Sequence, residues 1–262
     1  MEPVVPSVGW GVTHLYYRVD PGRAADPGQA GKELVLALES FEAAADHQVL
    51  CSSVLGLKAD LGIMALGPDL ARHDQLARAL ASGAAGSVLE PAYSFVSLTE
   101  LSEYTETVAQ ARERLAADGD QQHLDQRLSE VERRLQRYRD DKLHPRLPRK
   151  AILAFYPMSK AREPDANWYT LPFDDRRRLM GGHARVGRRH TGRVLQLITG
   201  ATGLDDFEWG VTLLADDLAA VKEIVYEMRF DEVTANYGRF GPFLVGLTLP
   251  PAELPARFAL LG

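Results

Sequence analysis

Two segments far apart in the chain align without a gap when residue 60 is placed over residue 208, a shift of 148 positions. DLGIMALGPDL (60–70) then lies over EWGVTLLADDL (208–218), and PAYSFVSL (91–98) lies roughly over RFGPFLVG (239–246). Both members of the first pair predict an apolar strand followed by an acidic residue that caps a helix. A repeat of this length limits the fold to two similar halves.

The two halves share one predicted order of elements: strand, helix, strand, strand, helix, strand. In the first half the predicted strands are 9–20, 47–57, 61–67 and 92–98, and the helices are 30–44 and 70–82. In the second half the strands are 151–156, 193–200, 207–215 and 241–247, and the helices are 174–189 and 216–230. This order is that of a ferredoxin-like unit. We therefore expect an α+β fold of two ferredoxin-like units, with their sheets joined or packed and the helices outside.

The segment between the halves predicts a helical hairpin. Apolar residues recur at spacings of three and four on either side of the turn-like ADGD (117–120). They are Leu101, Tyr104, Val108, Ala111 and Leu115, then Leu124, Leu128, Val131, Leu135 and Tyr138. Such helices form either a coiled coil that binds a partner or a pair that packs on its own domain or on a neighbouring subunit, and we favour the second interpretation. The expected division is an N-terminal unit at 1–99, the hairpin at 100–145 and a C-terminal unit at 146–262.

Composition excludes several classes of function. The net charge is −6, from 30 basic and 36 acidic residues, and no long basic block occurs, so nucleic-acid binding is a poor hypothesis. MEPVVPSVGW lacks the pattern of a signal peptide, and no apolar run reaches the length of a membrane span, so we expect a cytoplasmic protein. Cys51 is the only cysteine, which rules out an intramolecular disulfide and a multi-cysteine metal site.

The stretch FYPMSK (155–160) ends an apolar run with several chemically different groups. Strand alternation places every second residue on one face, and these residues are Ile152, Ala154, Tyr156, Met158 and Lys160. Pro157 removes a ladder donor, so we expect this end of the strand at a sheet edge or exit. The residues alone favour a tyrosine at the rim of the core followed by a solvated lysine. The alternative is a wall of functional groups that faces a ligand.

The stretch LMGGHARVGRRH (179–190) holds the second candidate, His183, among Gly181, Gly182 and Gly187. A helix face without bulk lets a flat ligand approach closely, and glycine otherwise weakens a helix. No HExxH or similar spacing occurs, so a zinc or di-iron site built from protein ligands alone is not expected. One histidine suffices as an axial heme ligand. The alternatives are an exposed helical histidine, or His190 as the ligand, although its place at the helix end favours capping.

Five arginines surround these candidates: Arg162, Arg185, Arg188, Arg189 and Arg193. Guanidinium groups pair well with carboxylates, so some could bind the propionates of a porphyrin. Most of them are expected to form a solvated helix face.

Several ordered motifs together resemble a known family. They are YPMSK, NWYTLPFDDRRRLM, HARVGRRHTGRVLQLITG, DDFEWGVTLLADD and VYEMRFDEVTANYGRFGPFLVG. In this order and spacing they are similar to the coproheme decarboxylases of the chlorite dismutase-like superfamily. The resemblance is dense from Phe155 to Gly246 and thinner in the first half, where YSFVSLTELSEY (93–104) is its clearest part.

The resemblance implies a homopentamer whose subunits each hold two ferredoxin-like units. It also implies an enzyme of heme biosynthesis, in which hydrogen peroxide drives the oxidative decarboxylation of two propionates of iron coproporphyrin III, giving vinyl groups and heme b. The porphyrin is then both substrate and redox cofactor. Direct hand-over of the substrate by a ferrochelatase is a further expectation.

Residue roles follow from the resemblance position by position. It implies that Tyr156 is oxidised to a radical that in turn oxidises the propionate, that His183 is the axial iron ligand, and that Gln196 lies on the distal side, where chlorite-degrading relatives carry an arginine. Thr234 stands where the family usually has a serine, and its hydroxyl is expected to bind a propionate. The propionate side is expected to be lined by Tyr156, Pro157, Met158, Ser159 and Lys160.

Two positions stay open. The family's upstream propionate-binding arginine falls at Lys142 by counting, while Arg146 and Arg149 lie nearby. A lysine supplies the charge but not the bidentate fork of an arginine. Glu232 is a candidate partner for the second nitrogen of His183. The alternative functions are a chlorite dismutase-like peroxidase and a non-catalytic heme carrier.

Overall fold

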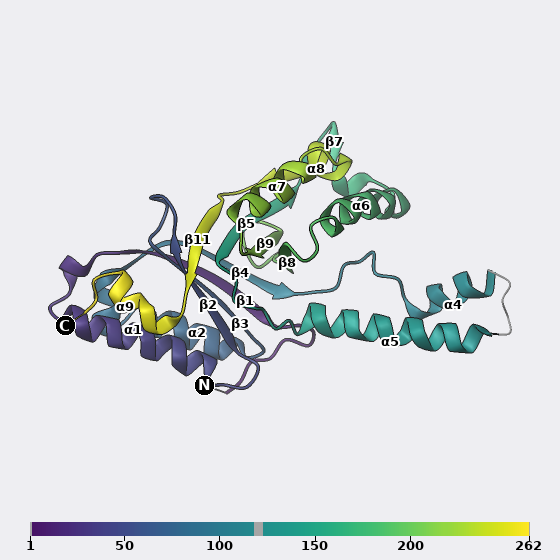
Figure 1. Cartoon of the computed structure of the whole chain (residues 1–262). Coiled ribbons are helices and arrows are strands. Elements are labelled where there is room, and N and C mark those ends of the chain that lie inside the picture. The colour runs from purple at the N-terminus through teal and green to yellow at the C-terminus, as the bar shows by residue number, and fades with distance from the viewer. Residues whose placement is uncertain (1, 118–122, 262) are drawn as a thin grey trace.

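A computed structural model of the chain describes residues 2–117 and 123–261 (Figure 1). Among these residues, nine strands form one antiparallel sheet and two more form a small hairpin. The strands of the sheet are β1 Gly11–Val19, β2 Gln48–Val54, β3 Leu61–Gly67, β4 Leu89–Thr99, β5 Ile152–Lys160, β8 Val194–Gly200, β9 Trp209–Ala215, β10 Gly238–Phe240 and β11 Leu244–Leu249; the hairpin is β6 Arg162–Glu163 and β7 Ala166–Asn167. The helices are α1 Pro27–Glu42, α2 Leu70–Leu80, α3 Gly83–Val88, α4 Val108–Ala117, α5 Leu124–Leu143, α6 Phe173–Arg188, α7 Leu218–Met228, α8 Glu232–Tyr237 and α9 Leu254–Arg257.

The large sheet closes on itself. Its order is β10-β5-β11-β2-β3-β1-β4-β8-β9, and β9 also pairs with β5, so eight strands form a ring and β10 extends β5. The strands of the two halves meet at β11 with β2 and at β4 with β8. The predicted α+β fold is therefore confirmed, with the two sheets joined rather than packed face to face.

The duplication is visible in the elements. β3 and β9 begin and end 148 positions apart, and so do α2 and α7. The helices also share one cap: Asp69 accepts a hydrogen bond from the backbone N–H of Ala71, and Asp217 accepts one from Ala219. The acidic residue that ends each aligned strand is therefore the N-cap predicted for it.

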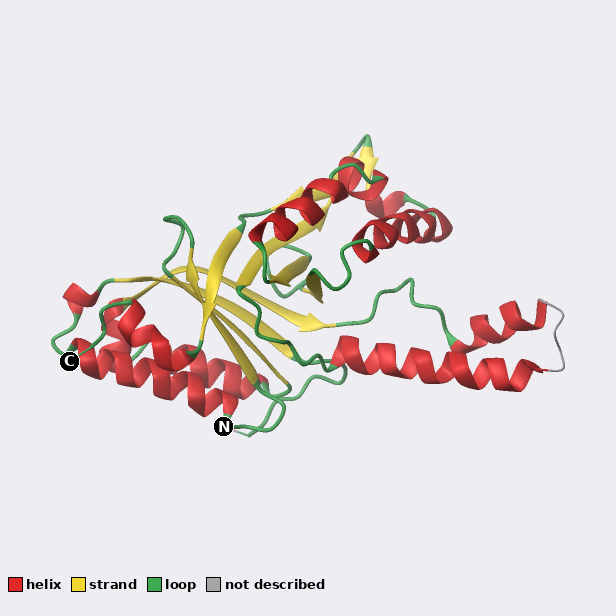
Figure 2. Ribbon diagram, in the orientation of Figure 1, coloured by secondary structure: helices red, strands yellow, loops and turns green. Residues whose placement is uncertain are grey.

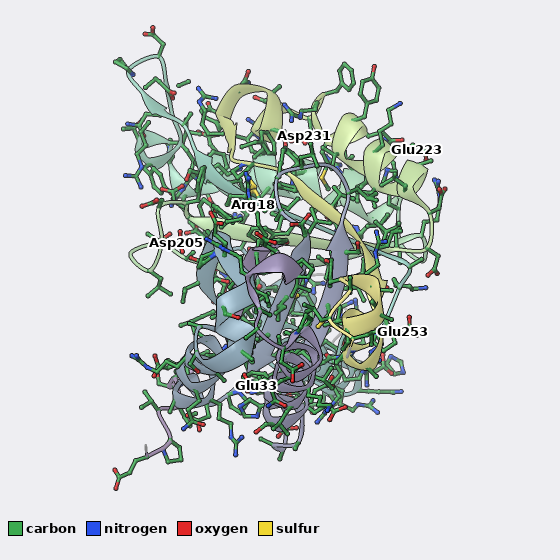
Figure 3. All side chains as sticks on the ribbon, turned by 90° about the vertical axis from the view of Figure 1, so that its left-hand side faces the viewer. Arg18, Glu33, Asp205, Glu223, Asp231 and Glu253 are labelled. Carbon is green, nitrogen blue, oxygen red and sulfur yellow. The ribbon has the colours of Figure 1, made fainter. Side chains whose placement is uncertain are left out.

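Three of the four apolar clusters among the described residues form the inside of the ring and two outer layers. One cluster takes residues from all eight ring strands, including Val12, Phe95, Phe155 and Leu214, and so fills the inside of the ring. A second cluster packs α1 and α2 on the outer face of the first half, and includes Leu254 and Leu260 from the end of the chain. A third packs α7 on the outer face of β5, β8 and β9. Figure 3 shows the helices of the two halves at opposite ends of the molecule, with Glu33 of α1 near one end and Asp231, at the start of α8, near the other.

α5 extends away from the ring, and α4 packs along it (Figures 1 and 2). Ala111, Leu115 and Leu128 are buried between them, whereas 37% of Tyr138 is exposed. Leu101 and Tyr104, expected in the first helix, precede α4 instead. The predicted turn ADGD falls largely at residues 118–120, outside the described part of the chain. The three-part division of the chain stays a prediction. Among the described helices, none is both long enough and apolar enough for a bilayer span.

Candidate functional site

Tyr156 lies on β5 with its ring in the outer apolar layer of the second half. Its side chain is 5% exposed, and its ring stacks on Phe243 at 4.5 Å between centroids and lies 5.7 Å from Phe240. Ile152 and Ala154 share this layer, whereas Phe155 points into the ring. The predicted alternation of the strand is therefore confirmed.

Pro157 does not mark a sheet edge, which corrects the expectation from its missing donor. β5 pairs with β9 over 152–158, and on its other side with β11 over 152–155 and with β10 over 158–160. The Pro157 carbonyl accepts a hydrogen bond from Gly241 in the break between β10 and β11, so its nitrogen faces the same break, where no ladder donor is needed. Gly241 allows this approach, because a Cβ there would lie 2.6 Å from the Pro157 ring.

A cation lies beside the buried phenol. Burial raises the pKa of Tyr156 to about 12, and the positive charge of Arg229 partly opposes that rise. The Arg229 guanidinium lies 4.2 Å from the centroid of Phe240, which itself packs near Tyr156. Sequence reasoning did not single out Arg229. Its only sequence signal is a position directly after the last turn of α7, whose Met228 enters the Tyr156 layer.

His183 projects from α6 toward α8. Its Nδ1 lies 3.0 Å from a carboxylate oxygen of Asp231, and its side chain is 25% exposed. The partner of the imidazole is therefore Asp231 and not the neighbouring Glu232, which points to Arg178 at 3.7 Å. The correction has a geometric cause. Asp231 is the N-cap of α8, so its carboxylate turns back over the helix start, whereas Glu232 belongs to the first helical turn and points outward.

The Asp231 carboxylate is held by several donors. It accepts hydrogen bonds from the backbone N–H groups of Val233 and Thr234 and, at 2.9 Å, from the Thr234 hydroxyl. Burial by itself raises the pKa of Asp231, but His183 and the Thr234 donors outweigh it and hold the pKa below its usual value. Asp231 therefore stays ionised and fixes a proton on Nδ1 of His183, which leaves Nε2 as the nitrogen able to bind a metal.

Lys160 is buried rather than solvated. Its side chain lies over Trp168, with Nζ 4.8 Å from the ring centroid, and 8% of the residue is exposed. Burial lowers the pKa of Lys160 to about 8, while the charges of Asp231 and Glu208 oppose the fall. The Lys160 ammonium therefore interacts through its charge with Asp231, the carboxylate that contacts His183.

Glu208 fixes the end of β5 that carries these groups. Its buried carboxylate accepts a hydrogen bond from the Lys160 backbone at 2.7 Å and pairs with Arg162. Its own backbone N–H donates to the Met158 carbonyl and to the Ser159 hydroxyl. Sequence reasoning missed Glu208, although it lies within the aligned segment EWGVTLLADDL.

The glycines of α6 do not share one face. A Cβ on Gly187 would lie 3.1 Å from Met228 and 3.2 Å from the Gln196 amide, so Gly187 faces the sheet and the Tyr156 layer. A Cβ on Gly181 would meet no atom within 4 Å, and Gly181 faces outward. Of these two glycines, only Gly187 therefore lies on the inner face of α6, opposite Gln196 of β8.

The rival and upstream candidates lie elsewhere. His190 is buried beyond the end of α6, and its Nε2 lies 3.1 Å from Glu227. Lys142 lies on the last turn of α5 near Tyr138, Arg146 pairs with Asp46, and Arg149 lies 3.6 Å from Glu42. The described contacts do not bring these three cations to the Tyr156 layer.

The residues that are brought together fit an iron porphyrin. The sheet supplies a phenol and an amide, and α6 supplies an imidazole whose Nδ1 is occupied by Asp231. Around Tyr156, the apolar side chains of Met158, Val186, Phe240 and Phe243 are only partly buried, and a flat apolar ligand would cover them. The imidazole would hold the iron, with Asp231 fixing its tautomer.

Comparison with known proteins agrees with the fold. The family model described as chlorite dismutase matches residues 29–249. A Halobacterium salinarum protein that is provisionally named a heme-binding protein is 39% identical over an alignment of 260 residues. The alignment covers 96% of this chain but 50% of that protein, so the chain spans about half of this relative. A solved structure of a heme-binding protein from Thermus thermophilus has 34% identity and a TM-score of 0.79, covering 98% of this chain and 100% of its own.

A mutant chlorite dismutase from Candidatus Nitrospira defluvii shares the fold at 17% identity, with a TM-score of 0.72 and 97% of each chain covered. The family match spans most of the chain, including every strand of the ring except β1 at its start. The chain belongs to the chlorite dismutase family.

Proposed function

We propose that this chain binds iron coproporphyrin III and uses hydrogen peroxide to decarboxylate two of its propionates, which gives heme b. One observation carries the proposal. β5 carries the buried Tyr156, and α6 carries His183, whose imidazole is held by Asp231. The two elements pack into the same apolar layer, β5 through Tyr156 and α6 through Val186. The names of the relatives support a porphyrin as the ligand. The family's ordered motifs, with Gln196 in place of an arginine, favour decarboxylation over chlorite degradation.

The proposed reaction balances for each propionate. The bond between the carboxylate and its neighbouring carbon breaks, carbon dioxide leaves, and the other carbon of the chain loses one hydrogen, so that a vinyl group forms. The two electrons released reduce one hydrogen peroxide to two water molecules. The iron of the bound substrate supplies the site at which peroxide reacts.

Tyr156 transfers the oxidising equivalent to the propionate. Its pKa of about 12 keeps the phenol protonated near neutral pH, so loss of an electron releases the hydroxyl proton with it. The oxidised phenol then takes one hydrogen atom, and with it the first electron, from the propionate. The iron of the bound substrate would accept the second electron as carbon dioxide leaves and the vinyl group forms. Nε2 of His183 would hold the iron, and the Gln196 amide would contact the bound porphyrin.

Charged and polar groups bind the propionates. Arg229 lies beside Tyr156, which makes it a candidate, whereas the described contact of the expected Lys142 is with Tyr138 on α5. Met158, Ser159 and Lys160 line the same strand end, and Pro157 sets its backbone. Thr234 already donates to Asp231, so its hydroxyl reaches a propionate only by exchanging that bond. Assembly as a homopentamer and hand-over by a ferrochelatase belong to the same proposal.

Mass spectrometry of the porphyrin before and after peroxide addition tests the proposal. The purified chain should convert iron coproporphyrin III to heme b with the loss of two carboxyl groups. Tyr156→Phe should bind the porphyrin with an unchanged absorption spectrum and lose at least about a hundredfold in the rate of vinyl formation, because the phenol hydrogen is absent. A variant that converts the substrate as fast as the parent chain would exclude the radical role of Tyr156.

A non-catalytic heme carrier is the second candidate, and the names of two relatives favour it. A carrier needs only His183 and an apolar pocket. Bound iron coproporphyrin III that survives peroxide unchanged would establish the carrier function. Release of oxygen from chlorite would instead establish a chlorite-degrading enzyme.

A further inference from the structure

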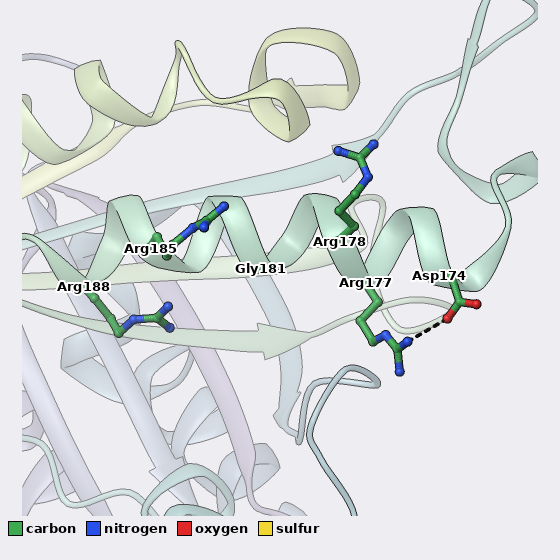
Figure 4. A pocket seen from close by; sticks show the side chains of 6 residues that line it. All are labelled: Asp174, Arg177, Arg178, Gly181, Arg185 and Arg188. Atoms are coloured by element: carbon green, nitrogen blue, oxygen red, sulfur yellow. Dashed lines mark ion pairs between the residues drawn. The ribbon is translucent and has the colours of Figure 1, made fainter. Parts of the chain in front are cut away.

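The outer face of α6 forms a shallow groove of about 360 Å³ (Figure 4). Spacings of three and four place its lining residues on one helix face. They are Asp174, Arg177, Arg178, Gly181, Arg185 and Arg188. His183 lies about half a turn from Gly181 and so projects from the opposite face of the helix. We call this surface the arginine groove.

Its charge is poorly balanced by the protein. Arg177 pairs with Asp174 at 2.9 Å, and Arg178 lies 3.7 Å from Glu232, a largely exposed pair. Within the part of the chain that the structure describes, no carboxylate pairs with Arg185 or Arg188. Both side chains extend along the helix toward Gly181, as Figure 4 shows. The missing side chain of Gly181 leaves open space between the guanidinium groups.

The groove contrasts with the rest of the molecule. α6 holds five arginines and two aspartates, a net charge of +3, within a chain whose net charge is −6. A protein with a negative net charge repels a polycarboxylate at long range. Close to a basic surface the interaction becomes attractive. The arginine groove occupies the same helix that presents His183 to the proposed site.

We infer that the arginine groove collects the carboxylates of the incoming porphyrin before it enters the site. This inference rests on the proposed porphyrin binding but not on decarboxylation. The groove attracts a ligand by charge and contributes no bond to the final complex. It should therefore act on the association rate, and more strongly on iron coproporphyrin III, with four carboxylates, than on heme b, with two.

Stopped-flow absorbance without peroxide measures association directly. Gly181→Glu should slow the association of iron coproporphyrin III by roughly threefold to tenfold at low salt relative to Gly181→Gln, because the two variants differ only in charge at an open position. Arg185→Gln with Arg188→Gln should also slow it, compared with Arg137→Gln with Arg139→Gln on α5, which changes the net charge equally. The differences should be smaller for heme b, and should vanish near 1 M salt, where the Debye length is about 3 Å.

Equal association rates for Gly181→Glu and Gly181→Gln would overturn the inference, and so would an effect of the same size on heme b. A change in dissociation rate alone would also overturn it, because the groove would then belong to the final complex. A change in oligomeric mass with unchanged association would assign the groove to contacts between copies of the chain. Failure of decarboxylation would leave all of these binding measurements unaffected.

Discussion

Asp231 uses one side chain for two purposes, because it begins helix α8 and holds the imidazole of His183. The orientation of a capping carboxylate is set by the helix that follows it, so the position of His183 depends on the backbone of α8 as well as on α6. The adjacent Glu232 carries the same charge but projects to Arg178. Residue type and sequence position therefore do not identify the partner of a histidine unless the cap geometry is known.

Asp231→Asn separates the charge from the cap, because asparagine caps a helix as well as aspartate does. The variant should weaken iron porphyrin binding by about 10-fold to 100-fold, since the imidazole loses its anionic partner. Resonance Raman spectroscopy of the ferrous complex should show a lower iron–histidine stretching frequency. Glu232→Gln is the matched control and should leave both measurements unchanged. If the two variants behave alike, Asp231 does not tune the ligand.

His14 is a second residue whose environment controls its protonation. It is fully buried inside the ring, where it stacks on Phe155 at 3.9 Å and its Nε2 lies 2.9 Å from the Thr212 hydroxyl. Burial lowers the pKa of His14 from 6.5 to about 3. Between these two values the unfolded chain binds a proton that the folded chain does not, so the free energy of unfolding falls as the pH is lowered through this window.

His14→Gln removes the difference in bound protons that His14 causes between the unfolded and the folded chain. The pH dependence of the free energy of unfolding should become shallower by about 1.4 kcal/mol per pH unit between pH 6 and 4. Urea unfolding at several pH values measures the slope. His73, whose pKa is lowered to about 4 by burial, should keep a residual slope of the same sign in the variant. An unchanged slope would mean that His14 becomes protonated in the folded protein.

At the scale of elements, the duplication predicts more than topology. The paired caps of α2 and α7 lie 148 positions apart, and in each the aspartate carboxylate accepts a hydrogen bond from the backbone N–H two residues later. They differ in one respect: Asp69 also accepts a hydrogen bond at 2.9 Å from the backbone of Val4, which ties the start of the chain to α2. The two sites therefore offer a natural comparison of a cap alone with a cap that also holds a second segment.

Asp217→Ala should reduce the free energy of unfolding by about 1 kcal/mol, the typical value of an N-cap. Asp69→Ala should cost more, by roughly a further 0.5–1.5 kcal/mol, because the Val4 donor loses its acceptor as well. Chemical denaturation of both variants measures the difference. Asp217→Asn and Asp69→Asn keep the caps and serve as controls. Equal losses in the two alanine variants would show that the Val4 contact adds no stability.

Apolar runs and helix periods were sufficient to predict the main elements, because the central strands are buried on both faces and the long helices bury one. β3 has the predicted limits, and the even-numbered face of β5 packs as expected. The short α3, α8 and β10 were not predicted, since segments of three to six residues carry too little periodicity. The edge prediction from Pro157 was wrong. Proline has no N–H to donate, and none is needed opposite the break between β10 and β11, just as none is needed at a sheet edge.

The candidate site shows the same limit. The local patterns singled out His183 and Tyr156 as candidates, but only the family resemblance implied their roles. Arg229, Glu208 and Asp231 were not, because their roles depend on which helix ends and strand ends meet in space. Long-range proximity of this kind is set by the ring closure and not by local spacing.

At the scale of the whole molecule, the ring makes the two halves share one interior. The inner cluster includes Val12, Leu66 and Phe95 from the first half and Phe155, Leu197 and Leu214 from the second. The end of the chain, through Leu254 and Leu260, returns to the outer layer of the first half. Neither half keeps a complete core if the other unfolds, so the duplicated halves should not behave as separate folding units.

Single-tryptophan variants test this cooperativity, because the three tryptophans report on different regions. Trp10 contributes to the inner cluster and is 9% exposed, whereas Trp168 packs with Leu179 and Val233 under the helices of the second half and is 3% exposed. Two variants each retain one of these tryptophans and carry phenylalanine at the other two tryptophan positions. In each variant, the fluorescence transition in urea should have the same midpoint as the transition followed by circular dichroism. An earlier Trp168 transition would mean that the helices carrying His183 detach before the ring opens, and the site would then be stable only while a ligand holds it.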